Sequence, residues 1–229
     1  GLAKMNLVLH NKASGEIKSG NTFSNPQYLD NGALKRFDFV VANPPFSLKN
    51  WTDGLQEFGR FDGYDDRPPE KNGDYAWLLH ILKSLKPTGK AAVILPHGVL
   101  FRGNAEESLR KNIIDRGYIK GIIGLPANLF YGTGIPAAIA IFRKGRGSEN
   151  VLFIDASREY ENGKNQNKLR PQDIDHIVGI YRKFANGELQ PGVVEDKYAY
   201  VATPDEIREN DYNLNIPRYV DTYEEEAEI

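Results

Sequence analysis

Four consecutive residues, Asn43-Pro44-Pro45-Phe46, combine side-chain and backbone groups that could do chemistry. The two prolines have no backbone N–H and restrict the backbone, and Pro44 also keeps Asn43 out of the helical region. The turn is therefore stiff, and it presents the Asn43 side-chain oxygen and nearby carbonyls as acceptors in a fixed direction. Phe46 adds an aromatic face on which a planar ring can stack.

Convergent acceptors of this kind suit an amino group attached to an aromatic ring. Such a nitrogen has two N–H donors and a lone pair delocalised into the ring. Acceptors that hold both hydrogens shift the nitrogen towards a tetrahedral geometry, and its lone pair can then attack an electrophilic methyl group directly. A base in duplex DNA must be flipped out to reach such a site. Alone, the tetrapeptide also fits a plain turn, so its place in the fold decides between the two interpretations.

The segments around this turn indicate an α/β fold, and FDFVVA before it is an apolar run that predicts a buried strand. Alternating strands and helices are typical of a mainly parallel sheet covered by helices. Strands are expected at 37–42, 91–95, 118–125 and 136–142, and helices at 74–85 and 104–116. The last two strands are joined by a loop alone, so they are expected to pair antiparallel. Ligands bind beyond the carboxyl ends of such strands, where Asn43 lies.

The remaining segments carry weaker signals. Residues 47–73 form a polar loop long enough to be functional or mobile, and Asp74 and Asn104 are expected to cap the helices that follow. Further expected elements are a helix at 1–11, a weak strand at 17–23, an edge strand at 151–154, a helix at 171–184, a strand at 198–202, a short helix capped by Thr203, and a frayed acidic end at 224–228.

Composition narrows the function classes. Apolar residues make up 40% and charged residues 26% of the 229 residues, as in ordinary globular proteins. The net charge of −2 provides no global attraction to nucleic acid, so DNA contacts would need local basic groups or a partner. The absence of cysteine excludes thiolate metal sites and the cysteine nucleophile of C5 cytosine methylation. No apolar run reaches a membrane span and no signal peptide is visible, so the cytoplasm is the expected location.

Several stretches resemble one protein family. FDFVVANPPF resembles the motif of amino-methyltransferases, and four later blocks are similar to the modification subunit of type I restriction-modification systems. These blocks are LPHGVLFRG (95–103), IIGLPANLFYGTGIPAAIAIF (122–142), KNQNKLRPQDID (164–175) and DYNLNIPRYVD (211–221). The resemblance implies a Rossmann-like S-adenosylmethionine-dependent methyltransferase fold with an antiparallel last strand. It also implies N6 of adenine in DNA as target and assembly with a specificity subunit and a restriction subunit.

The resemblance assigns residues to three overlapping groups. The catalytic group is Asn43, Pro44, Pro45 and Phe46, the donor-binding group is Asn21, Asn43 and Pro45, and the base pocket is Phe46, Phe130 and Tyr131. For Asn21, an ordinary turn asparagine is an equally good interpretation. The four histidines have no metal-ligand spacing, and His97, which lies near the expected active edge, is expected to be structural. The polar residues 164–172 could touch DNA or another subunit, and a solvated loop is slightly favoured.

The start of the chain differs from the family pattern. The chain opens at Gly1 inside a helix, and the Gly-rich donor-binding turn and the acidic residue of the next strand would precede it. We therefore expect a catalytic domain truncated at its N-terminus over residues 1–146, with a small C-terminal α/β extension at 147–229 packing on it. This polypeptide is expected to bind S-adenosylmethionine weakly or not at all, and micromolar binding in a calorimetric titration would contradict that. Alternatives are methylation of N4 of cytosine or of a protein glutamine, or a non-catalytic core that holds the other subunits.

Overall fold

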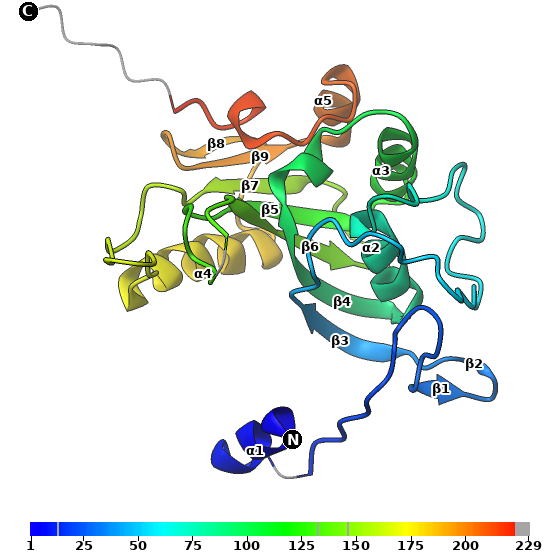
Figure 1. Cartoon of the computed structure of the whole chain (residues 1–229). Coiled ribbons are helices and arrows are strands. Elements are labelled where there is room, and N and C mark those ends of the chain that lie inside the picture. Colours follow the sequence, from blue (N-terminus) through cyan, green and yellow to red (C-terminus); the bar gives the residue numbers. More distant parts are fainter. Residues whose placement is uncertain (13, 132, 146, 223–229) are drawn as a thin grey trace, which may run out of the picture.

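A single mixed sheet organises the molecule (Figure 1). The computed structural model describes residues 1–12, 14–131, 133–145 and 147–222. The sheet has seven strands in the order β3-β4-β6-β5-β7-β9-β8. Their bounds are Phe37–Ala42 (β3), Leu85–Pro96 (β4), Ile119–Gly124 (β5), Ala137–Arg143 (β6), Val151–Asp155 (β7), Gly192–Glu195 (β8) and Ala199–Ala202 (β9).

Strand direction confirms the expected fold class. β3 pairs parallel with β4, and β5 pairs parallel with β7. β6 lies between β4 and β5 and pairs antiparallel with both, as the short connection after β5 predicts. β4 and β5 therefore run in the same direction although they do not touch. The result is a sheet whose strands β3, β4, β5, β7 and β8 share one direction, with β6 and β9 reversed.

β3 exists as predicted, but the prediction that it is buried is wrong. It forms the edge of the seven-stranded sheet and pairs only with β4 among the described strands. One face of β3 is open to solvent, with Phe39 74% and Val41 84% exposed. Val40 points to the other face, where it packs against the main core. The apolar composition of β3 predicted a strand correctly, but it could not show whether other elements cover both faces of that strand.

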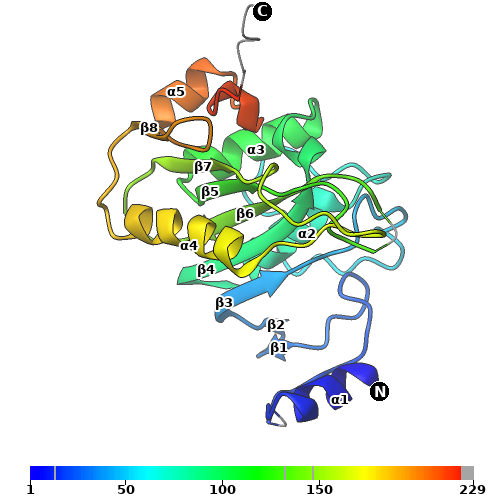
Figure 2. The same ribbon diagram turned by 90° about the vertical axis from the view of Figure 1, so that its left-hand side faces the viewer.

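Helices cover the two faces of the sheet (Figure 2). Helices α2 (Asp74–Lys83) and α3 (Ala105–Asp115) lie on one face, and their apolar side chains join the larger core cluster. Helix α4 (Pro171–Ala185) lies on the other face, where Ile177 and Ile180 pack against β5, β7 and β9. The covering by α2, α3 and α4 confirms the layered architecture expected from the alternation of elements.

The segment after residue 147 continues the same sheet. β7 was expected at an edge, and this is wrong, because β9 pairs with it on the side away from β5 and buries Val151 to Ile154 completely or nearly so. Helix α5 (Pro204–Glu209) begins as predicted at Thr203, whose hydroxyl accepts the backbone N–H of Glu206 at 3.2 Å. A short 3-10 turn follows at Ile216–Arg218. The division at residues 146 and 147 stays a prediction, and the expected frayed end at 224–228 lies outside the described residues.

The N-terminal part departs most from expectation. Helix α1 (Leu2–Leu9) forms as predicted and buries none of its residues. Residues 17–23 form no strand, and the small hairpin of β1 (Leu29–Asp30) and β2 (Ala33–Leu34) follows instead. The loop 47–73 is packed, because Trp51, Phe61 and Arg60 are 5%, 7% and 1% exposed. The burial of these three residues was not predicted, because the surrounding sequence is polar and rich in glycine.

Candidate active site

The carboxyl edge of the sheet brings the Asn-Pro-Pro-Phe turn close to a distant loop. Asn43 directly follows β3, which runs parallel to β4. β4 ends at Pro96, and the antiparallel partner of Pro96 is Ala137, the first residue of β6. The loop that joins β5 to β6 therefore lies at the same edge as Asn43. The loop lies about eighty positions or more further along the sequence than the turn.

Two aromatic residues of the predicted base pocket meet at this edge. The rings of Phe46 and Phe130 lie edge to face, with centroids 6.5 Å apart and planes at 80°. Phe46 is half-buried, so part of its surface stays available to another ring. Tyr131 is 91% exposed and makes no ring contact with Phe46 in the described structure. The turn and the β5–β6 loop thus provide an aromatic wall made by two segments, against which a flat ring could stack.

The residues of the Asn43-Pro44-Pro45-Phe46 turn differ in burial. Pro44 is buried, whereas Asn43 and Pro45 are exposed. Within the described part of the chain, no hydrogen bond engages the Asn43 side chain, so its oxygen and amide can bind a ligand. A stiff turn with an unpaired amide at its tip has the geometry expected of a preorganised acceptor.

Asp74 anchors the other end of the turn. Its side chain is 1% exposed, and one carboxylate oxygen accepts the backbone N–H of Ser47 at 2.6 Å. The other oxygen accepts a guanidinium N–H of Arg102, also at 2.6 Å. Asp74 was expected to cap α2, and this is wrong: Gly73 occupies the cap position and Asp74 is the first helical residue. Its carboxylate instead fixes the residue that directly follows Phe46.

Arg102 continues the network into α3. It donates to Glu106 at 2.6 Å, and the carbonyl of Arg102 accepts from the buried Arg110 at 2.8 Å. Burial raises the pKa of Glu106, and the hydrogen bond and charge of Arg102 oppose that rise. Asn104 occupies the cap position of α3, but its side chain makes no capping hydrogen bond, contrary to expectation. The network therefore connects the turn to two helices through charge-assisted bonds.

The polar stretch 164–172 supports the opposite side of the site. The Asn167 side chain donates to the carbonyl of Ala127 at 2.9 Å, and its backbone N–H donates to Asn128 at 2.8 Å. Gln166 donates to the carbonyl of Leu129. Gln166 and Asn167 thus hold the segment before Phe130, a role that the sequence did not suggest. The one sequence signal for this role was the presence of these amide side chains in a block that resembles a family motif.

Asn21, the candidate donor contact, lies in a different place from Asn43. Its side-chain oxygen accepts the backbone N–H groups of Phe23 at 2.8 Å and Ser24 at 3.1 Å, as in an ordinary Asx turn. It also lines a pocket of about 640 Å³ together with the exposed face of β3, including Phe39. Neither Asn43 nor Pro45 lines this pocket. The structure therefore brings Phe46 and Phe130 together, but it does not join Asn21 to the turn.

Arg60 ties the pocket wall to α2. It is 1% exposed and donates to the carbonyls of Thr22, at 2.7 Å, and Gln56, and to Nδ1 of His80, at 2.9 Å. Burial, and then the charge of Arg60, lower the pKa of His80 to about 4, so this imidazole is neutral and can accept the bond. The segment that holds Asn21 is therefore fixed to the long loop and to α2 through one side chain.

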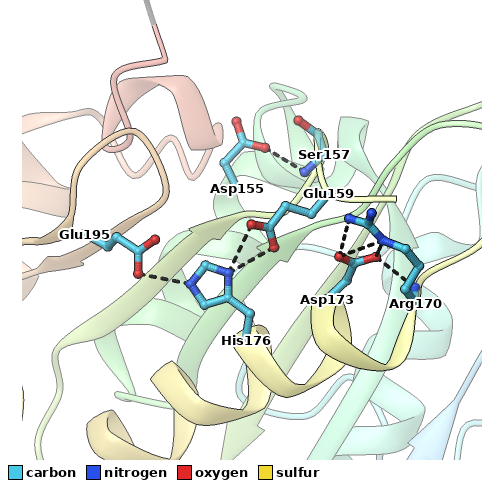
Figure 3. A network of polar contacts seen from close by, with 7 residues as sticks. All are labelled: Asp155, Ser157, Glu159, Arg170, Asp173, His176 and Glu195. Carbon is cyan, nitrogen blue, oxygen red and sulfur yellow. Dashed lines mark hydrogen bonds and ion pairs between the residues drawn. The ribbon is translucent and has the colours of Figure 1, made fainter. Parts of the chain in front are cut away.

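Two other histidines, His97 and His176, make structural contacts. Nε2 of His97 lies 3.1 Å from the carbonyl of Ala137, which links the ends of β4 and β6. On α4, His176 lies between Glu159 and Glu195, with a nitrogen 3.0 Å from a carboxylate oxygen of each (Figure 3). The same ring stacks on Tyr198 with centroids 4.0 Å apart. Among the residues the structure describes, no cluster of three or more histidine and acidic side chains could hold a metal ion.

The fold of this chain is similar to that of several solved structures. The type I restriction-modification methyltransferase subunit from Streptococcus thermophilus is similar with a TM-score of 0.86 and 41% identity, over 97% of this chain and 46% of that one. The EcoKI M protein shares the fold with a TM-score of 0.67 at 21% identity, over 98% of this chain and 52% of that one. The fold is that of S-adenosylmethionine-dependent methyltransferases.

The family follows from the sequence comparisons. The chain belongs to the N-6 DNA methylase family, whose model matches residues 1–228. The MjaIX type I methylase subunit of Methanocaldococcus jannaschii is 35% identical over 96% of this chain, and the MpnII subunit of Mycoplasma pneumoniae is 31% identical over all of it. The chain spans 40% and 42% of the length of these two relatives. No described helix has the length and apolarity needed to cross a membrane.

Proposed function

We propose that this protein methylates N6 of adenine in DNA, with S-adenosylmethionine as methyl donor. The observation that carries the proposal is the turn Asn43-Pro44-Pro45-Phe46 at the carboxyl edge of the sheet, with an unpaired Asn43 amide beside the Phe46–Phe130 pair. Adenine has a planar ring and an exocyclic amine, so it needs both an aromatic wall and paired acceptors.

Each residue of the site has a role in this proposal. The Asn43 oxygen and the Pro44 carbonyl accept the two amine hydrogens and stabilise the charge that develops on the nitrogen as it attacks the methyl group. Phe46 stacks on the flipped base, and Phe130 and Tyr131 border it from the β5–β6 loop. The donor supplies the electrophilic methyl group, and Asn43 and Pro45 are the candidate residues that hold it at the turn, whereas Asn21 lines a separate pocket.

The relatives' names suggest the assembly in which the reaction takes place. The MjaIX and MpnII proteins are methylase subunits of type I restriction enzymes. We propose that this protein is likewise the modification subunit and assembles with a specificity subunit and a restriction subunit on DNA. The net charge of −2 fits such an arrangement, because a partner would then provide most phosphate contacts.

The test is Asn43→Ala in the complete enzyme, assembled with its partner subunits. Because the Asn43 side chain is exposed and makes no hydrogen bond to the described residues, the unfolding free energy should change by about 0.5 kcal/mol or less. Methyl transfer to a duplex should fall by about 100-fold or more, as when an oxyanion-type donor or acceptor is removed. The matched control is Asn162→Ala, which removes another exposed asparagine amide and should leave the rate unchanged.

The acceptor is identified in the same assay. Transfer of labelled methyl groups is compared between duplexes with and without adenine and a protein acceptor rich in glutamine. Incorporation that requires adenine supports the proposal. Incorporation into cytosine-only duplexes or into protein would contradict it, as would a rate for Asn43→Ala close to wild type.

A further inference from the structure

A cluster of basic residues lies at the sheet edge opposite to Asn43. Arg36 directly precedes β3, Lys83 is the last residue of α2, Arg116 follows α3, and Lys144 directly follows β6. These four side chains, together with the buried Arg60, line a hollow of about 370 Å³, which we call the cationic hollow. β3 has six residues, so at about 3.3 Å per residue roughly 20 Å of sheet separates the cationic hollow from the turn.

The lining of the cationic hollow is unbalanced in charge. The whole chain has 29 basic and 31 acidic side chains, whereas the only carboxylate in this lining is that of the exposed Asp62. Within the described part of the chain, none of the four cations forms an ion pair. Four neighbouring positive charges that share one carboxylate repel one another, so the bare hollow is electrostatically unfavourable.

Packing holds the cations at fixed positions. The guanidinium of Arg116 lies 4.1 Å from the ring centre of Tyr64 and donates one N–H to the carbonyl of Gly63. The ammonium of Lys144 lies 5.6 Å from the ring centre of Tyr118. A guanidinium has five N–H donors, so Arg116 can donate to a further acceptor beside its contacts with Gly63 and Tyr64. The donors are therefore oriented before any ligand arrives, which lowers the entropic cost of binding.

The floor and the rim of the cationic hollow differ in solvation. Lys83 and Lys144 are half-buried, whereas Arg36 and Arg116 are exposed at the rim. Burial lowers the pKa of Lys144 most, and repulsion from the other three cations lowers it further. The ammonium at the floor is thus poorly hydrated and surrounded by like charges. A compact anion seated over the floor would relieve both effects at once.

We propose that the cationic hollow binds a phosphate group, from either a nucleotide or the backbone of a nucleic acid. Guanidinium groups at the rim match the oxygens of phosphate in pairs, and the lysine ammonium groups at the floor act as point charges. A volume of 370 Å³ is at the small end of ligand pockets and accommodates a compact anion. The site is separate from the turn, so its occupation does not depend on methyl transfer.

The primary experiment is a calorimetric titration of the chain with inorganic pyrophosphate at low ionic strength. The test variant is Lys83→Gln/Lys144→Gln, and the control variant is Lys49→Gln/Lys71→Gln, which removes the same charge from exposed positions in the 47–73 loop. Wild type and the control should bind pyrophosphate saturably with the same affinity. The test variant should bind at least about tenfold more weakly, because it lacks two charge-assisted contacts.

Thermal melting shows whether the test variant is folded. Removal of two like charges from the cationic hollow relieves repulsion, so its melting temperature should equal or exceed that of wild type, and pyrophosphate should raise only the wild-type and control values. A folded test variant with unchanged affinity would overturn the proposal. Equal weakening in both double variants would also overturn it, because the binding would then reflect overall charge alone.

Two further arms identify the source of the phosphate. If both double variants bind a short duplex equally but only Lys83→Gln/Lys144→Gln loses a nucleoside triphosphate, the natural ligand is a free nucleotide. If that variant loses the duplex and pyrophosphate competes with the duplex, the ligand is a nucleic-acid backbone. Both outcomes support a phosphate site. A poly-glutamate peptide that binds the hollow more tightly than pyrophosphate would overturn it in favour of an acidic protein segment.

Discussion

The substitution Asp74→Asn tests how strongly the network behind the turn holds it. Asp74 accepts from the backbone of Ser47 and from Arg102, each at 2.6 Å, and its side chain is 1% exposed. Asparagine has nearly the same shape, but it keeps one oxygen only and places an NH₂ group against one of the two donors. The substitution therefore isolates charge and acceptor count from packing.

The expected loss of unfolding free energy in Asp74→Asn follows from the burial of these contacts. A hydrogen bond to a charged group contributes about 1.5–3 kcal/mol, and an unsatisfied buried partner costs about as much. Arg102 keeps its bond to Glu106, so the guanidinium is not left alone. We expect Asp74→Asn to lower the free energy of unfolding by about 2–4 kcal/mol. The complete enzyme should also lose methyl transfer more than donor binding, because the acceptors of the turn lose their fixed direction.

The matched control is Asp38→Asn. Asp38 also forms an ion pair, with Lys86 at 2.8 Å, but the two side chains are 63% and 47% exposed. Such a surface pair contributes about 0–1 kcal/mol. Urea unfolding of both variants, analysed with a common slope, gives the comparison directly. Equal losses for Asp74→Asn and Asp38→Asn would refute the conclusion that the buried carboxylate anchors the turn.

Two further predictions concern the parts that frame the site. Burial lowers the pKa of His176, but the hydrogen bonds and charges of Glu195 and Glu159 outweigh burial and raise it above its ordinary value of 6.5. Protonated His176 therefore stabilises the fold fully below pH 6.5, and this contribution is lost as the pH rises through the raised pKa. The difference in unfolding free energy between wild type and His176→Gln should shrink over that range. A difference that does not change with pH would contradict this. Arg60→Met should cost about 2–4 kcal/mol, because it removes three hydrogen bonds made by a buried guanidinium, whereas Arg67→Met, which breaks an exposed pair, should cost about 1 kcal/mol or less in the same urea assay. A similar cost for both arginines would contradict the anchoring role of Arg60.

Local sequence signals predicted most of the elements. The alternation of apolar runs and capped helices was sufficient for β3, β4, β5, β6, α2, α3 and α4, and the short β5–β6 connection predicted their antiparallel pairing. Periodicity is a property of one segment, so it could not reveal which strands lie beside one another. That is why β3 was expected to be buried and is exposed on one face, and why β7 was expected at an edge and is interior.

The candidate site also has parts that the sequence could predict and parts that it could not. The Asn43 turn was visible because its residues are adjacent in the sequence and each has a distinct chemical property. Phe130 was found only through resemblance, and its contact with Phe46 depends on the order of the strands. Asp74 and Asn167 were misjudged, because a carboxylate at a helix start and an amide in a polar loop have many ordinary uses. Long-range partners decided their roles, and no local pattern encodes them.

The insertion of β6 between β4 and β5 also determines the order in which the sheet can form. β4 and β5 are synthesised first, but they are not neighbours in the sheet, and the strand that pairs with both comes later in the chain. On the ribosome, both strands must wait with unpaired edges until Ala137–Arg143 has emerged. Non-local pairing of this kind delays folding and exposes apolar strands to misassembly. The aromatic wall of Phe46 and Phe130 therefore forms only in the step in which β6 joins β4 to β5.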